Sequence, residues 1–458
     1  MKCDTRIVGA GLLVVAGALA AAGIAHASVG GPRVERLRRT VVVGDSLLAG
    51  FISGGFVARD QRRAAPALIA RRASVKLSQP LMSGAGVPPP LRIDDRDGDG
   101  ALDAEEVRRG SVNVGFRKYP GARVRNLAVP GEDITSVFER VDIEDAAASG
   151  DGRDILKFLI LGLPLRDDSV SQLTQAEELD PSFMLVWLGN NDVLTMATKT
   201  NPARAELSPA QFGAEYRRFL ARLADGGVDM AIANLPDVTR IAALRGPGEE
   251  VTGCIGAGGV VEPAAPDWLV RLDLDTAELP EPPCTNVLDA AEQAEVRGTV
   301  MAFNAEIAAA IADVELNRGI TIATVDMFAL FDGIAINGYD VNGDGTLVLT
   351  TDYLGGIFSL DGIHPTRTAH ALIANAFIDA INTRFGEAIP LVNVATTAER
   401  DKLVTNRYRP QGEPPFGLLA GVDTEIDDAL DDALADVGDA IDDIIDDIED
   451  FFGDVFDF

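Results

Sequence analysis

The sequence predicts a doubly wound α/β domain, in which a mostly parallel sheet is covered by helices on both faces. Short runs rich in β-branched and other apolar residues recur over most of the 458 residues. Amphipathic stretches with a helical period lie between or after these runs, and this alternation is typical of parallel sheets. The first run ends in Gly-Asp-Ser, a turn at the sheet edge where α/β proteins place functional groups. We therefore expect one large domain, although the length would also suit two.

The expected elements follow one another along the chain with three long gaps. Strands are expected at 40–43, 122–128, 183–188, 229–234 and 319–325. Helices are expected near 209–225, 287–314 and 366–385. The remaining length is expected in insertions near 51–120, 236–286 and 331–358. Such insertions often build the walls of a substrate cleft, and the alternative is that they only decorate the surface.

Ser46 is the most informative residue of the chain. It lies in the segment Thr40-Val-Val-Val-Gly-Asp-Ser-Leu-Leu-Ala-Gly50, where a buried strand is followed at once by a tight turn. Such a turn lifts the serine hydroxyl to the rim of the sheet. Because a serine hydroxyl is a weak nucleophile at neutral pH, it needs a base within hydrogen-bond reach and donors for the oxyanion.

The candidate base is His364. The chain has three histidines, and His26 lies in an N-terminal segment that we expect to be removed. His364 has Asp361 three residues before it, a spacing at which a carboxylate can hold the imidazole tautomer. The proline that follows favours a loop before the next helix. His370 falls inside that helix, where we expect a packed or solvated histidine.

The candidate oxyanion donors are Gly131 and Asn191. Gly131 ends the segment Asn-Leu-Ala-Val-Pro-Gly, and Asn191 lies in Gly-Asn-Asn-Asp; both segments follow strand-like runs. A glycine lets its backbone N–H approach a substrate closely, and an asparagine amide donates to developing charge without being charged itself.

Taken in order, Gly-Asp-Ser-Leu, the glycine after Asn-Leu-Ala-Val-Pro, Gly-Asn-Asn-Asp and Asp-Gly-Ile-His resemble the four sequence blocks of the GDSL (SGNH) hydrolase superfamily. The resemblance implies a flavodoxin-like three-layer α/β/α fold with a mostly parallel five-stranded sheet. It also implies that Ser46 is the nucleophile and that His364 is the base, oriented by Asp361. The oxyanion hole would then be formed by the Ser46 N–H, the Gly131 N–H and the Asn191 side chain.

The expected function is hydrolysis of carboxylic esters, of lipase or carboxylesterase type, through an acyl-enzyme and without a catalytic cofactor. Apolar residues close to the nucleophile in sequence favour acyl chains, and they include Phe51, Ile52, Leu81 and Met82. The substrate is then a small-molecule or lipid ester. A carbohydrate deacetylase or an acyltransferase would use the same site. A different class also stays open, a calcium-dependent extracellular binding protein on an inactive hydrolase scaffold.

The N-terminus predicts export. Residues 1–27 have two basic residues, a long apolar run and Ala-His-Ala at the end, which is typical of a signal peptide; an uncleaved anchor is the alternative. The hydrolase domain is expected over 28–388, extracellular or periplasmic, without a further transmembrane segment. In that oxidising environment, Cys254 and Cys284 are expected to form a disulfide, and buried free thiols remain the alternative.

Two acidic loops predict calcium sites. The first, Asp95 to Glu106, has the oxygen spacing of an EF-hand loop, although a Pro-Pro-Pro run stands where the entering helix would be. We therefore expect a structural calcium ion, with the ligands Asp95, Asp97, Asp99, Ala101, Asp103 and Glu106. A weaker second loop lacks the acid at position twelve, and an Asp/Gly-rich turn is its alternative; its ligands would be Asp340, Asn342, Asp344 and Thr346. Calcium in the second loop would rigidify the segment before His364.

The formal charge of −31 is concentrated at the C-terminus. Residues 421–458 contain sixteen Asp and Glu and no Lys or Arg, and their apolar residues recur every three or four positions. This pattern predicts an amphipathic acidic helix that docks on a partner or surface; the alternative is a partly disordered tail. Residues 389–420 are expected to be a linker. The acidity argues against a nucleic-acid partner.

Overall fold

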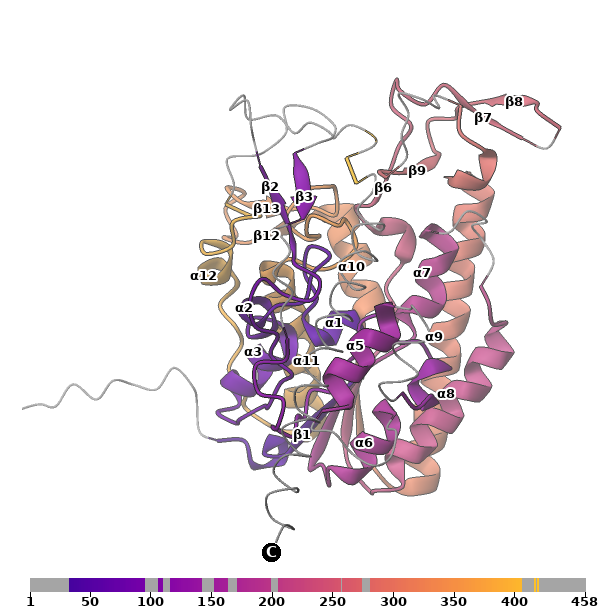
Figure 1. Ribbon diagram of the computed structural model, residues 1–458. Helices are drawn as coiled ribbons and strands as arrows, with labels where there is room; N and C mark the ends of the chain where they lie inside the picture. Colours follow the sequence, from indigo (N-terminus) through magenta and orange to yellow (C-terminus); the bar gives the residue numbers. More distant parts are fainter. Residues whose placement is uncertain are drawn as a thin grey trace, which may run out of the picture.

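The structure is a computed structural model, and it describes residues 33–94, 106–109, 116–141, 152–163, 171–198, 205–256, 258–273, 281–405, 416, 418 and 419. In this part of the chain, parallel strands form a central sheet in the order β1-β4-β5-β11 (Figure 1). The strands are β1 (Thr40–Gly44), β4 (Phe183–Trp187), β5 (Met230–Ala233) and β11 (Ile322–Val325). Each lies within a few residues of a predicted strand, so the α/β class and the parallel sheet are confirmed.

The strand expected at 122–128 is the exception. It occupies the sheet position beside β1, but only Asn126 forms a parallel bridge, with Val42. Around that bridge, the N–H of Val42 donates to the Arg125 carbonyl and the N–H of Leu127 donates to the Val42 carbonyl. The N–H of Val129 donates to the Gly44 carbonyl, but the Gly44 N–H is taken by the Gln172 side chain. At the other end the Arg125 N–H donates to the Ser78 carbonyl, so the ladder stays short. The predicted fifth strand is therefore a single bridge at the sheet edge.

Helices cover both faces of the sheet (Figure 1). α11 packs on β11 and on α3, whereas α6 packs on β1 and α8 packs on α9. The rings of Phe212 and Phe303 stack at 4.0 Å between α8 and α9. The helices are α1 (Ser46–Ala49), α2 (Ala58–Gln61), α3 (Ala65–Arg72), α5 (Gly152–Leu161), α6 (Gln172–Glu178), α7 (Asn190–Thr198), α8 (Pro209–Ala224), α9 (Ala290–Arg318), α10 (Met327–Asn337), α11 (Arg367–Phe385) and α12 (Val394–Ala398).

The predicted helices begin and end at residues with clear local signals. α9 begins after Asp289, whose side chain accepts a hydrogen bond from the N–H of Glu292, and it ends at Gly319 with φ 64°. α11 begins after Thr366, whose side chain caps the N–H of Ala369. No helix among the described residues is long and apolar enough to cross a membrane.

The insertions form small sheets above the carboxyl ends of the central strands (Figure 1). Their strands are β2 (Leu91–Ile93), β3 (Val107–Arg109), β6 (Leu244–Arg245), β7 (Gly253–Ile255), β8 (Val261–Pro263), β9 (Leu269–Arg271), β10 (Val287–Leu288), β12 (Tyr339–Asp340) and β13 (Val348–Leu349). Cys254 and Cys284 form the predicted disulfide, with 4.9 Å between their Cα atoms and a separation of 30 residues in sequence. Closing a loop of this length stabilises a fold by about 3–4 kcal/mol through the entropy of the unfolded chain.

Part of the expected linker packs on the domain instead. α12 contacts α11, and the buried side chain of Asp401 accepts hydrogen bonds from the N–H (2.9 Å) and the hydroxyl (3.0 Å) of Thr368.

α10 extends to Asn337, so the insertion expected from 331 begins inside a helix. The expected signal peptide, most of the first calcium loop and the acidic tail lie outside the described residues.

His370 is completely buried in α11, where its Nδ1 accepts from the N–H of Ala65 at 3.4 Å. Burial, helped by the nearby charge of His364, lowers the pKa of His370 to about 3 from 6.5. Because the unfolded chain binds this proton more readily, the histidine lowers the free energy of unfolding progressively as pH falls below about 6.5.

We expect a His370→Asn variant to show a flatter pH dependence of unfolding between pH 7 and pH 4 than the wild type. Asparagine can still accept from the N–H of Ala65, but it does not titrate. The smaller side chain lowers stability at pH 7, so the comparison concerns the slopes. Urea unfolding midpoints measured at each pH test this, and parallel curves for the two proteins would contradict it.

Candidate active site

Ser46 stands at the carboxyl end of β1, as the first residue of α1. The whole of β1 is buried, and Gly44 lies so close to β4 that an added Cβ would be 2.4 Å from the Trp187 carbonyl oxygen. Asp45 caps α1 by accepting from the N–H of Leu47. The Gln172 side chain holds Gly44 from both sides, accepting from its N–H at 3.0 Å and donating to its carbonyl at 2.8 Å. The nucleophile candidate is therefore anchored on rigid backbone.

His364 and Asp361 form a close pair, with 2.9 Å between Nδ1 and the carboxylate Oδ2. The other oxygen, Oδ1, accepts from the N–H groups of Ile363 and His364, and the N–H of Gly54 also donates to Asp361. Burial alone would raise the pKa of Asp361, but His364 and these hydrogen bonds outweigh it and hold the pKa below its usual value. The Phe51 ring lies 4.8 Å from the imidazole. Asp361 thus stays ionised and fixes the ring that faces it.

A cavity that is open to solvent lies beside Ser46, with about 570 Å³ of empty space including its solvent-filled mouth. Asn190 and Asn191 line it, as do Ile363 and Pro365, the two neighbours of His364. Most of its wall is apolar and comes from α7, η3 (Val238–Arg240), α10 and the segment before His364; examples are Leu194, Val238, Ile241, Phe331 and Phe358. Phe51, Ile52, Leu81 and Met82, which the sequence placed near the nucleophile, are not among its lining residues. Proximity in sequence failed here because Phe51, Ile52 and Met82 are buried, and Phe51 packs beside the His364 ring.

Asp45 and Asn190 form a buried contact behind the nucleophile. The Asn190 amide donates to Asp45 Oδ2 at 2.7 Å, and both side chains are almost inaccessible to solvent. Burial raises the pKa of Asp45 to about 6, against the opposing effect of the Asn190 hydrogen bond. Neither residue was predicted to belong to the site. The doubled asparagine of Gly-Asn-Asn-Asp was the only local signal, whereas nothing near Gln172 indicated its role.

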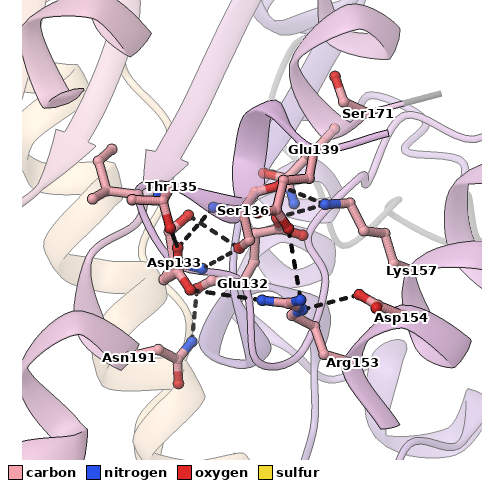
Figure 2. Close-up of polar contacts among 12 residues, drawn as sticks. Glu132, Asp133, Thr135, Ser136, Glu139, Arg153, Asp154, Lys157, Ser171 and Asn191 are labelled. Atoms are coloured by element: carbon pink, nitrogen blue, oxygen red, sulfur yellow. Dashed lines mark hydrogen bonds and ion pairs between the residues drawn. The ribbon is translucent and has the colours of Figure 1, made fainter. Parts of the chain in front are cut away.

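The two expected oxyanion donors lie on adjoining segments. Gly131 has φ 82°, a conformation that favours glycine, and it immediately precedes Glu132. The Asn191 amide donates to the Glu132 carbonyl at 2.7 Å, as Figure 2 shows. Asn191 lines the cavity, whereas Gly131 is not among the cavity residues. An amide nitrogen carries two hydrogens, so this contact leaves one N–H of Asn191 for a ligand.

The second acidic loop connects β12 to β13. Asp340 accepts from the N–H groups of Asn342, Gly343 and Gly345, and Asp344 accepts from the N–H and hydroxyl of Thr346. These contacts close a tight Asp/Gly-rich turn and leave the carboxylates exposed. Among the described residues, the only group of three close metal-ligating side chains is Cys254, Glu262 and Cys284, whose cysteines are joined.

Among solved structures, the chain is similar to an α/β hydrolase enzyme from the metagenome of Lake Arreo, Spain, with 14% identity and a TM-score of 0.31 over 74% of this chain and 93% of that one. It is also similar to an extracellular lipase from Streptomyces rimosus, with 13% identity and a TM-score of 0.30 over 75% and 98%. Comparison with curated proteins gives no match. The model of the family "GDSL-like Lipase/Acylhydrolase" matches residues 41–377, well over half of the chain. The protein therefore belongs to the GDSL-like lipase/acylhydrolase family.

Proposed function

We propose that the protein is an exported serine hydrolase that cleaves carboxylic esters of apolar acyl chains. The observation that carries the proposal is the Asp361–His364 pair, whose neighbours line the same cavity as Ser46 and Asn191. Family membership supports an acylhydrolase, and the wall of the cavity supports an apolar acyl group. Export is supported by the features of residues 1–27 and by the disulfide, which is typical of oxidising compartments.

In the proposed mechanism, the Ser46 hydroxyl attacks the ester carbonyl while His364 takes its proton through Nε2. Asp361 holds Nδ1 and stabilises the imidazolium that forms. The N–H groups of Ser46 and Gly131 and the amide of Asn191 donate to the oxyanion of the tetrahedral intermediate. When the intermediate collapses, His364 returns the proton to the leaving alcohol. Water then attacks the acyl-enzyme by the same steps and releases the carboxylic acid.

A series of p-nitrophenyl esters from acetate to palmitate tests this function on the mature protein. Each methylene that is buried in the cavity contributes about 0.8 kcal/mol, or roughly a fourfold rise in kcat/KM. We expect kcat/KM to rise from acetate until the chain outgrows the cavity. Hydrolysis of acetate alone would favour a deacetylase, and folded protein that hydrolyses no member of the series would overturn the proposal.

We also propose that calcium is a structural ion in the loop Asp95 to Glu106, of which only the buried Glu106 lies in the described residues. The spacing of the carboxylates supports this proposal. Calcium at a hundred times its Kd would stabilise the fold by about 3 kcal/mol. We therefore expect a chelator to lower Tm by a few degrees in the wild type but not in Asp97→Asn. Asp344→Asn tests the second loop in the same way. A Tm and activity that chelation leaves unchanged would refute the role of calcium.

A further inference from the structure

A lysine and a glutamate are buried together next to the expected oxyanion hole. Lys157 comes from the middle of α5, and Glu132 follows Gly131; their side chains are 1% and 0% exposed. The Lys157 ammonium donates to Glu132 Oε1 at 2.9 Å and to the Ser136 carbonyl at 2.5 Å (Figure 2). Burial raises the pKa of Glu132, and the Lys157 ammonium opposes that effect.

This ammonium holds both ends of one short segment. Residues 132 and 136 are its two contact points, and between them Asp133 closes a turn by accepting from the N–H groups of Thr135 and Ser136. The same segment is tied to α7 at two further points. Its Glu132 carbonyl accepts from Asn191, and its Ile134 N–H donates to the Asp192 carboxylate at 3.1 Å. The segment therefore links α5 to the helix that carries Asn191.

Stability alone does not account for a buried pair of this kind. Removing two charges from water costs several kcal/mol per ion, and apolar residues of similar volume often serve stability equally well. A buried ammonium with two close acceptors does, however, fix the position of the groups that it contacts. Here Glu132 follows Gly131, and its carbonyl accepts from Asn191. Oxyanion donors lose much of their effect when they are displaced by about 1 Å.

We propose that Lys157 and Glu132 are positioning residues, which hold the Gly131 N–H and the Asn191 amide in place for the oxyanion. The inference rests on the proposed ester hydrolysis. Because the oxyanion forms only after attack, the pair acts on the transition state more than on the bound substrate. Its loss therefore lowers kcat and leaves KM nearly unchanged.

The test compares kcat and KM of wild type and Lys157→Met on the best p-nitrophenyl ester. We expect kcat to fall about 10- to 100-fold, with KM within about twofold. In an Asn191→Ala background, the same change should cost less, because both act on the same donors. The control is Arg36→Met, which breaks the ion pairs of Arg36 with Asp229 and Glu387 at the other end of the sheet. A kcat no lower than in this control, or losses that simply multiply, would overturn the inference.

A second variant separates the loss of positioning from misfolding. The double change Glu132→Gln with Lys157→Met removes both charges together, and we expect it to fold while its kcat remains at least about tenfold low. Hydrogen exchange of residues 131–136, relative to Arg36→Met, gives a readout that is independent of catalysis. Faster exchange in Lys157→Met is expected, and unchanged exchange refutes positioning. If the wild type hydrolyses no ester, the proposed function fails and the catalytic part of the inference fails with it, whereas unchanged exchange in an active enzyme overturns only the positioning role of the pair.

Discussion

Replacing Ser46 with alanine is expected to lower kcat/KM for every ester by about 10⁴-fold or more, because it removes the hydroxyl that forms the acyl-enzyme in the proposed mechanism. The fold should be retained, since Asp45 still caps α1 through the N–H of Leu47. A phosphonate ester should label one serine in the wild type and none in the variant, as measured by intact mass.

The control for this experiment is Ser208→Ala. Ser208 caps α8 by accepting from the N–H of Gln211, and it does not line the cavity. Loss of such a cap costs about 1 kcal/mol of stability and leaves kcat unchanged. Full activity or full labelling in Ser46→Ala would show that the chemistry uses another nucleophile.

Replacing Asp361 with asparagine is expected to lower kcat by about 10³- to 10⁴-fold with little change in KM. The amide has nearly the same size, but it offers no negative charge to the imidazolium and favours the wrong tautomer of His364. Steady-state kinetics and circular dichroism separate this effect from unfolding.

Ser359→Ala is the matched control for the aspartate. The Ser359 hydroxyl donates to Asp361 Oδ1 at the long distance of 3.4 Å, so its loss should change kcat by less than about tenfold. An Asp361→Asn variant as active as Ser359→Ala would assign the orientation of His364 to another group.

The charge of Asp361 also contributes to stability. Because the pKa of Asp361 is lowered in the fold, its ionised form stabilises the protein above about pH 3.8, and this contribution is lost as the pH falls further.

Elements whose signals are local could be predicted well. β1 and β4 are short apolar runs, and all their residues are buried, as expected for a parallel sheet. α11 has Pro365 and Thr366 before it and Gly386 after it, so neighbouring residues determine where it begins and ends. Two of the four motifs that resemble a hydrolase family directly follow β1 and β4, and Asp-Gly-Ile-His lies just before α11.

Other elements could not be predicted, because contacts with residues far away in the sequence determine their structure. The segment after α11 has the composition of a linker, yet Asp401 binds Thr368 and draws it onto the domain. The run at 122–128 has a strand pattern, but the Ser78 carbonyl competes for its N–H groups. Thr368 and Ser78 both lie far in the sequence from the segments that they contact.

The sequence alone determined the fold class, the family and the candidate groups Ser46, Asp361, His364, Gly131 and Asn191, because each lies in a short pattern of its own. Only the tertiary structure decided what surrounds these groups. The contact of Asn190 with Asp45 spans 145 residues and that of Gln172 with Gly44 spans 128. The apolar cavity wall likewise comes from several separate segments. Such contacts depend on how helices pack across the sheet, and no local spacing encodes that packing.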